Sequence, residues 1–153
     1  MTNKPIKRHK ALQNLSREHH DGLIFALRLQ KGVAKKAELQ DMEEYATWFW
    51  KHHLVPHFEM EETHLFPRLD DEHELVKEAK QQHLELKSFF DVKSKSYLDF
   101  ERIYKLLQKH IRLEERELFN LIQKQLNENQ LKEFHDIHDS QQACEVWPNP
   151  FWK

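Results

Sequence analysis

Apolar side chains recur every three to four positions along most of the chain, the spacing that places them on one face of an α-helix. This pattern predicts four long helices joined by short turns and then a shorter fifth helix. Their approximate ranges are 16–32, 38–66, 71–92, 97–126 and 128–138. Four long helices with short connections predict an all-α, up-down-up-down four-helix bundle. We expect one domain over residues 1–153, with the bundle at about 10–126 and a C-terminal helix and aromatic tail at 127–153.

Several residues indicate where these helices begin, bend and end. Ser16 is a good N-cap candidate for the first helix, and Gly32 is a stop signal near its end. Pro67 closes the second helix. Pro56 lies inside that helix and removes one backbone hydrogen bond, so we expect a kink just before His57.

Two of the predicted helices contain the same ten-residue frame. The two copies are HFEMEETHLF at residues 57–66 and HIRLEERELF at residues 110–119. Within the frame, His57 and Glu61 lie one turn apart on one helix face, as do His110 and Glu114, so each pair can reach one centre. Both glutamates lie on faces that otherwise point to the core. Because a buried carboxylate without a compensating charge is costly, the pattern predicts cations between the helices.

The first and third helices offer further imidazoles. His83 has apolar residues three, six and seven positions later, and His20 has apolar residues at the same offsets. His19 matches less well because Gly22 occupies the first of these positions. The pattern therefore favours His20 over His19 and leaves both as candidates. The helices then read His, His-x-x-x-Glu, His, His-x-x-x-Glu, an order with an approximate internal twofold.

The composition narrows the chemistry of this centre. The chain has 12 histidines and one cysteine, so its metal ligands are imidazoles and carboxylates, which suit iron, zinc or manganese. The single Cys144 excludes an internal disulfide and fits a reducing compartment. The N-terminal MTNKPIKRHK lacks the apolar core of a signal peptide, and no apolar run is long enough to span a membrane. We therefore expect a cytoplasmic protein.

The charge pattern bears on partners. Formal net charge is −2, with 24 basic and 26 acidic residues spread along the chain and no basic block. This pattern gives no reason to expect nucleic acid or a membrane as a partner.

Four segments resemble the hemerythrin-like (HHE cation-binding) family. They are REHHDGLIF, HLVPHFEMEETHLFP, QQHLELKSFF and KHIRLEERELF, and they fall within about residues 15–126. The resemblance implies a four-helix bundle around a non-haem di-iron site, bridged by two carboxylates and an oxo or hydroxo species. It assigns ligand roles to His20 (or His19), His57, Glu61, His83, His110 and Glu114. In this assignment the two glutamates are the bridges.

The sequence departs from the oxygen-carrying hemerythrins, which have two histidines four residues apart on the third helix. The positions four residues from His83 are Ala79 and Lys87. The carriers also place an aspartate five residues after the histidine of the fourth helix. Glu115 has that spacing here, whereas the internal repeat favours Glu114. We expect one iron to be short of a histidine and open to an exogenous ligand.

Other polar residues receive lesser roles. Water, a carboxylate or His53 could fill the missing ligand position. Glu62 and Glu115 are expected to be outer partners or surface residues. Four histidines that lie near the ends of predicted segments or in the tail are expected to be solvated: His9, His73, His135 and His138.

These features favour a di-iron protein that binds O2 or a similar small ligand such as NO, in oxygen, NO or redox sensing or in iron handling. A ferroxidase-type or metal-assisted enzyme is an alternative, although the sequence shows no additional general base or substrate pocket. A helical interaction module with a structural metal is another alternative. The aromatic tail CEVWPNPFWK could then contact a protein partner, but its simpler role is to pack over one end of the bundle.

Overall fold

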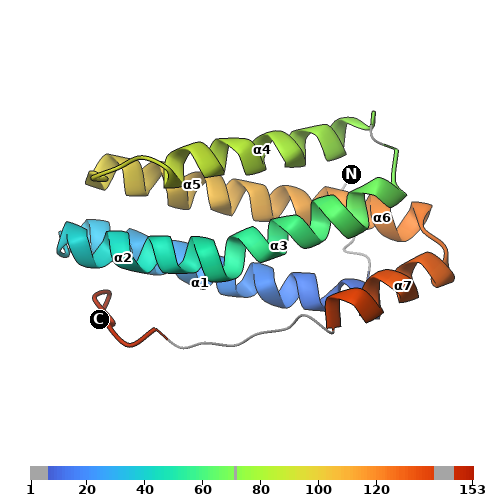
Figure 1. Ribbon diagram of the computed structural model, residues 1–153, viewed down its shortest axis with the longest axis horizontal. Helices are drawn as coiled ribbons and strands as arrows, with labels where there is room; N and C mark the ends of the chain where they lie inside the picture. Colours follow the sequence, from blue (N-terminus) through green and yellow to red (C-terminus); the bar gives the residue numbers. More distant parts are fainter. Residues whose placement is uncertain (1–6, 71, 140–146) are drawn as a thin grey trace.

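The computed structural model describes residues 7–70, 72–139 and 147–153, and it contains no strand within these ranges. Its α-helices are α1 (Gln13–Ala34), α2 (Leu39–Phe49), α3 (Val55–Met60), α4 (Glu74–Phe90), α5 (Tyr97–Leu113), α6 (Phe119–Gln125) and α7 (Glu128–Asp139). Figure 1 shows that α2 continues into α3 and α5 into α6, so that α1, α2–α3, α4 and α5–α6 form antiparallel rods. The predicted all-α bundle with an additional C-terminal helix is confirmed.

Turns of π-helix interrupt two of the four rods. They span Trp50–Leu54, between α2 and α3, Glu61–Leu65, after α3, and Glu114–Leu118, between α5 and α6. The last two begin at the matching glutamates of the internal repeat, so the shared sequence frame has a shared backbone irregularity. Such turns are rare and are frequently found at functional sites.

Pro56 is accommodated by the first of these π turns. Proline has no backbone N–H to continue an α-helical ladder. The turn at Trp50–Leu54 ends two residues before Pro56, and the N–H of Val55, the residue between them, donates to the carbonyl of Trp50. The wider turn thus coincides with the expected break in hydrogen bonding. Figure 1 shows α3 leaving at an angle to α2, in agreement with the bend predicted near His57.

Polar side chains cap several helix ends. Ser16 is not an N-cap, because α1 is already helical from Gln13 and is preceded by a short 3-10 turn. The imidazole of His9 caps that turn and the imidazole of His73 caps α4, so neither is the simple solvated residue that the sequence suggested. Ser96 forms a capping box at the start of α5. Asp71, the expected start of the third helix, lies outside the described residues.

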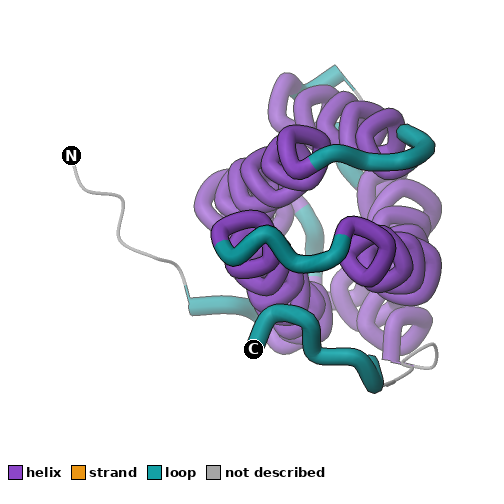
Figure 2. The backbone as a smooth tube through the Cα atoms, turned by 90° about the vertical axis from the view of Figure 1, so that its left-hand side faces the viewer, coloured by secondary structure: helices purple, strands orange, loops and turns teal. Residues whose placement is uncertain are grey.

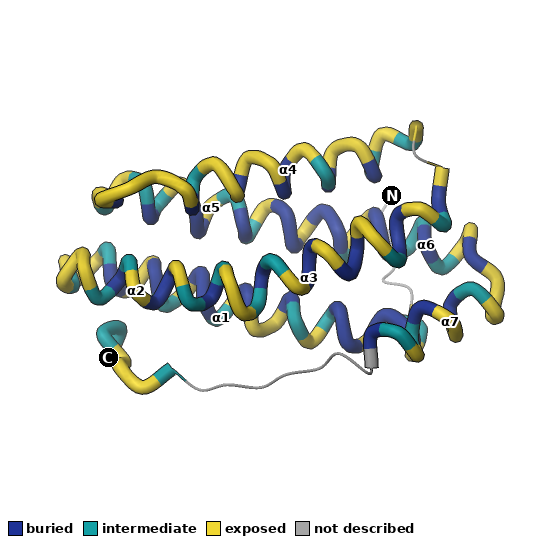
Figure 3. The backbone as a smooth tube through the Cα atoms, in the orientation of Figure 1, coloured by how far each residue is buried: buried dark blue, intermediate teal, exposed yellow. Residues whose placement is uncertain are grey.

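The core consists of two apolar clusters separated by a polar layer. Figure 3 shows the buried positions lining the inner sides of the rods. One cluster includes Leu12, Leu15, Phe119, Ile122 and Phe134. The other includes Phe25, Leu29, Tyr45, Phe100 and Ile103. Along α1, Leu15 and Phe25 belong to different clusters, so the residues between them cross the polar layer.

The C-terminal segment packs on the outside of the bundle, as Figure 2 shows in an end-on view. The rings of Trp147, Phe151 and Trp152 lie 5.7, 5.3 and 5.1 Å from the ring of Tyr45, between centroids. The guanidinium of Arg28 lies 4.1 Å above the ring of Trp152. The described part of the tail therefore packs against α1 and α2, whereas residues 140–146 lie outside the described ranges.

Candidate metal centre

Six polar side chains meet in the layer between the two apolar clusters. They are His19, His57, Glu61, His83, His110 and Glu114, and none is more than 5% exposed. They come from all four rods, and both glutamates begin π turns. Because burial of so many ionisable groups is unfavourable without compensation, this layer is a candidate functional site.

The six side chains form two groups that share both carboxylates. His19 and His57 join Glu61 and Glu114 in one group, which we call the first metal position. His83 and His110 join the same two glutamates in the second metal position. In each group, one possible ligand atom per residue can be chosen so that all lie within 4.8 Å of one another. Ligands about 2.1 Å from a metal lie roughly 3 to 4.2 Å apart, so each group has dimensions suited to one ion.

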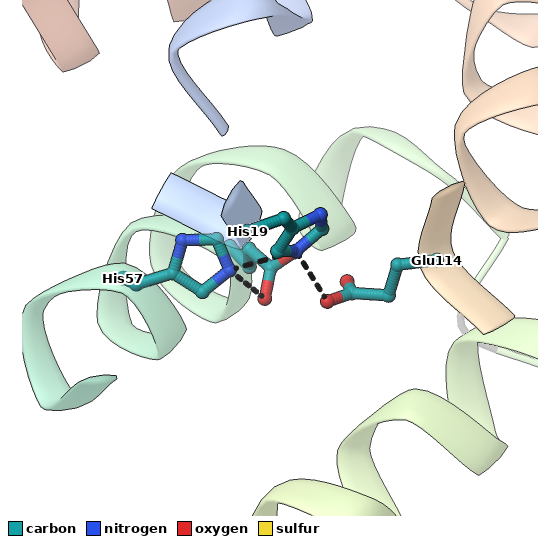
Figure 4. A group of neighbouring side chains, drawn as sticks. His19, His57 and Glu114 are labelled. Carbon is teal, nitrogen blue, oxygen red and sulfur yellow. Dashed lines mark hydrogen bonds and ion pairs between the residues drawn. The ribbon is translucent and has the colours of Figure 1, made fainter. Parts of the chain in front are cut away.

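Each glutamate lies between one imidazole of the first position and one of the second. Glu114 Oε1 is 3.2 Å from His19 Nε2 and 2.7 Å from His110 Nε2. Glu61 Oε1 is 3.4 Å from His57 Nε2 and 3.3 Å from His83 Nε2. Figure 4 shows the carboxylate of Glu114 directed toward the imidazole of His19, beside His57. This is the placement that two bridging carboxylates require.

Each of the four imidazoles forms a hydrogen bond through Nδ1, the ring nitrogen that faces away from the centre. The four contacts are His19 to Glu115 at 2.9 Å, His57 to Glu18 at 2.7 Å, His83 to Glu62 at 2.8 Å and His110 to Gln82 at 2.7 Å. An ionised carboxylate only accepts hydrogen bonds, so the Nδ1 atoms facing Glu115, Glu18 and Glu62 donate. In the neutral imidazoles Nε2 is then the acceptor atom that faces the centre, the arrangement usual for metal-bound histidines.

The inner atoms lack the hydrogen-bond donors that they would need without a cation. Within the described residues, neither oxygen of Glu61 nor Oε2 of Glu114 accepts a hydrogen bond. The Nε2 atoms of His19 and His57 lie only 3.2 Å apart, as do those of His83 and His110. Burial and the adjacent charge of Glu114 raise the pKa of Glu61 well above its ordinary value. Two cations would stabilise both ionised carboxylates, so the residues fit a two-metal centre.

Two imidazoles related by the internal twofold differ in protonation. Burial lowers the pKa of His19, but its hydrogen bonds to Glu114 and Glu115 more than offset this and raise that pKa to about 9. For His83, burial prevails over the hydrogen bond to Glu62 and lowers the pKa to about 4. In the metal-free protein, His19 therefore compensates part of the charge of the two glutamates that it faces, whereas His83 is a neutral imidazole at neutral pH.

The structure brings together five of the six preferred ligand candidates and replaces the sixth. His20 is exposed and outside both groups, whereas His19 is buried within the first position. Of the three apolar residues that favoured His20, Leu23 and Leu27 are 41% and 46% exposed, and only Ala26 is buried in the core. The structure therefore places His19, and not the preferred His20, among the candidate ligands.

Gly22 explains why the helix face was misjudged. It is one of the buried residues of α1, on the same side as His19. A Cβ atom added there would lie 3.0 Å from Cδ1 of Ile111, so α5 packs closely against this turn. A glycine at a helix–helix contact is part of the core face although it contributes no apolar side chain. Close packing, which hydrophobic spacing does not reveal, was the missing signal.

The remaining candidates have other partners. The ring of His53 stacks on Phe49, with centroids 4.7 Å apart, and belongs to neither metal group. Glu115 holds His19 from behind, and Glu114 has the bridging place that the internal repeat favoured. His138 was expected to be solvated, but it is only 2% exposed and bonds to Glu18. No sequence spacing links that pair, which lies 120 residues apart.

Each group contains two histidines, so the two positions do not differ in the number of imidazoles. A cavity of about 160 Å³ borders the polar layer, and its lining includes both imidazoles of the first position, His19 and His57, and one of the second, His110. A cavity of this size and mixed lining can admit water or a small molecule to the candidate centre.

Comparisons with known proteins agree with this site. The family model of the hemerythrin HHE cation binding domain matches residues 10–122. No curated protein and no solved structure gives a significant match. Among the described residues, no helix is long and apolar enough to cross a membrane. The match covers most of the chain and all six buried candidate ligands, so the chain belongs to the hemerythrin HHE cation-binding domain family.

Proposed function

We propose that this chain binds two iron ions, bridged by Glu61 and Glu114, and that the loaded centre binds O2 or a similar small ligand such as NO. The observation that carries the proposal is the pair of buried two-histidine groups sharing both carboxylates. The family match supports cation binding. The choice of iron and of ligand rests on the chemistry of the donors and on their surroundings.

The donor set suits iron. Neither group contains a thiolate, and each offers two imidazoles together with carboxylate oxygens. Such sets with open positions are typical of non-haem iron sites that react with O2. The cavity beside His19 and His57 gives a small ligand a route to the first position, which a closed structural zinc site would not need.

The surrounding side chains hold the centre in a dry environment. The ring of Phe58 stacks on His83, with centroids 3.9 Å apart, and Phe119 stacks on His19 at 5.2 Å. These contacts fix the planes of the imidazoles and keep water from their faces. Bound iron supplies the redox chemistry, while the protein sets ligand orientation, solvent access and local charge.

The biological use that we favour is sensing of oxygen, NO or redox state, or iron handling. The cavity next to a buried centre suits reversible ligand binding better than turnover of a large substrate. We place this function in the cytoplasm because one cysteine in 153 residues fits a reducing compartment.

The test is metal content per chain after expression with iron, combined with absorption spectra before and after exposure to air. We expect close to two irons and a ligand-to-metal band that changes on oxygenation or on addition of NO. The double variant His57→Ala, Glu61→Ala should lose both the iron and the band. One zinc per chain, or no metal and no band after anaerobic iron reconstitution, would contradict the proposal.

A further inference from the structure

Helix α7 is linked to the candidate metal centre through Glu18, although it lies beyond the family match at residues 10–122. His138, near its end, places Nε2 2.8 Å from Oε2 of Glu18. The other oxygen of Glu18 lies 2.7 Å from Nδ1 of His57. Since a carboxylate only accepts hydrogen bonds, both imidazoles donate to it. The result is a continuous chain from α7 through Glu18 to an imidazole of the first metal position.

The internal twofold shows that the two halves have different acceptors at equivalent places. Glu18 precedes His19 as Gln82 precedes His83. Each of these preceding residues accepts from the histidine of the following long rod, so Gln82 holds His110 as Glu18 holds His57. His57 and His110 are thus equivalent imidazoles of the two metal positions, but His57 has an anionic acceptor behind it and His110 has a neutral amide.

The difference has a direct effect on the imidazole. A carboxylate that accepts from Nδ1 makes Nε2 a more basic ligand than an amide does, because it stabilises the positive charge that metal binding places on the ring. The orientation of the carboxylate also matters. The side chain of Glu18 is 28% exposed and would be drawn toward water, whereas His138 is buried and holds its second oxygen.

We propose that His138 is a positioning residue that, through Glu18, orients and polarises His57 and so makes the first metal position bind its ion more tightly than the second. The inference rests on the proposed two-metal function. It concerns residues outside the metal groups and assigns α7 a role in the centre.

A purely structural role for His138 makes a different prediction. Helix α7 is already anchored in the apolar core by Leu131 and Phe134, which are 2% and 0% exposed. If His138 only attached α7, its loss would affect both metal positions alike or neither. A positioning role acts on the first position alone, because only that position contains His57.

Stepwise binding of Co²⁺ to the metal-free full-length protein, followed by the cobalt absorption bands, separates these outcomes. We expect two resolved steps in the parent. His138→Leu should weaken the tighter step by roughly tenfold and leave the other unchanged, since loss of an outer partner typically costs 10- to 100-fold in affinity. His138→Gln keeps a donor near the same place and should restore most of the loss. Lys132→Ala, an exposed change on α7, is the matched control and should behave as the parent.

The reciprocal exchange tests the same idea without changing α7. Glu18→Gln gives the first position the amide of the second, so the two binding steps should converge. Gln82→Glu should strengthen the weaker step. If the parent binds two ions and the His138 and Glu18 variants bind them with unchanged or equally weakened steps, this inference is overturned while the proposed function stands. A parent that binds no metal overturns the proposed function and this inference with it.

Discussion

The two halves of the bundle supply the same ligands in the same order but differ in what surrounds them. His19, His57 and Glu61 of the first half match His83, His110 and Glu114 of the second. Three residues after the first imidazole of each half, the first half has Gly22 and the second has Leu86.

This difference bears on the space beside the candidate centre. Leu86 is fully buried and fills its place, whereas Gly22 lines the cavity that borders both imidazoles of the first position. The set of candidate ligands is therefore nearly symmetric, while the surrounding packing and the outer hydrogen bonds are not. We infer that the shared carboxylates govern binding of both ions and that the asymmetric residues tune the first position.

Removing either shared carboxylate is expected to have the largest effect. Because each carboxylate belongs to both metal groups, Glu61→Ala and Glu114→Ala should each abolish tight binding of both ions. Metal content per chain after desalting measures this directly. Glu59→Ala, an exposed change near Glu61, should retain both ions. Retention of one tightly bound ion in either variant would show that the carboxylate does not bridge.

Replacing the carboxylates that accept from Nδ1 should affect the two metal positions separately. Glu115→Gln replaces the acceptor behind His19, and Glu62→Gln replaces the one behind His83. Each should weaken its own metal position by roughly tenfold and leave the other unchanged. Stepwise metal binding to the two variants is the measurement. Equal weakening of both steps in one variant would mean that the positions are not independent at this level.

The pH dependence of the metal-free protein should have opposite signs in the two halves. The pKa of His83 is lowered in the folded state to about 4, so the unfolded chain takes up its proton first and stability falls as pH drops from about 6.5 to about 4. The pKa of His19 is raised to about 9, so its contribution is present below about 6.5 and is lost as pH rises to about 9. Denaturant unfolding of His83→Gln and His19→Gln across pH should flatten the acid limb and the alkaline limb respectively.

Gly22→Ala should have the smallest effect on stability. The added Cβ would lie 3.0 Å from Cδ1 of Ile111, the flexible end of a side chain that can move slightly. We expect a cost below about 2 kcal/mol in the free energy of unfolding, within the usual range for overpacking. The smaller cavity should slow ligand binding. Adding Ile111→Val, which removes the contacted methyl group, should recover the loss; no recovery would place the strain elsewhere.

The sequence predicts the bundle and most of the centre because those features repeat. The frame around His57 and His110 occurs twice, so four of the six candidate ligands are supported by two independent copies. His19 has no such support, and a glycine on its helix face obscured the core side. The bond between Glu18 and His138 depends on where α7 packs against α1, and no local spacing in the sequence reveals that placement.

The start of α1 was also not predictable from local sequence. Ser16 is a suitable N-cap by type, but its hydroxyl donates to both oxygens of Glu115, 3.0 and 2.9 Å away. A residue that is usually a local signal thus serves a contact between rods. Local propensity predicts that a helix exists more reliably than where it begins, because tertiary partners compete for the same side chains.

The π turns at Glu61–Leu65 and Glu114–Leu118 constrain the number of residues in each copy of the ten-residue frame. Each turn holds about one residue more than an α-helical turn, so relaxing it to α-helix without loss of a residue would rotate the segments on its two sides by about 100° relative to one another. The glutamate and the Leu-Phe pair that follows it could then no longer face the interior together. Insertions and deletions should be tolerated in the loops between the rods, whereas one further residue inserted within 57–66 or 110–119 should uncouple the metal centre from the packing that surrounds it.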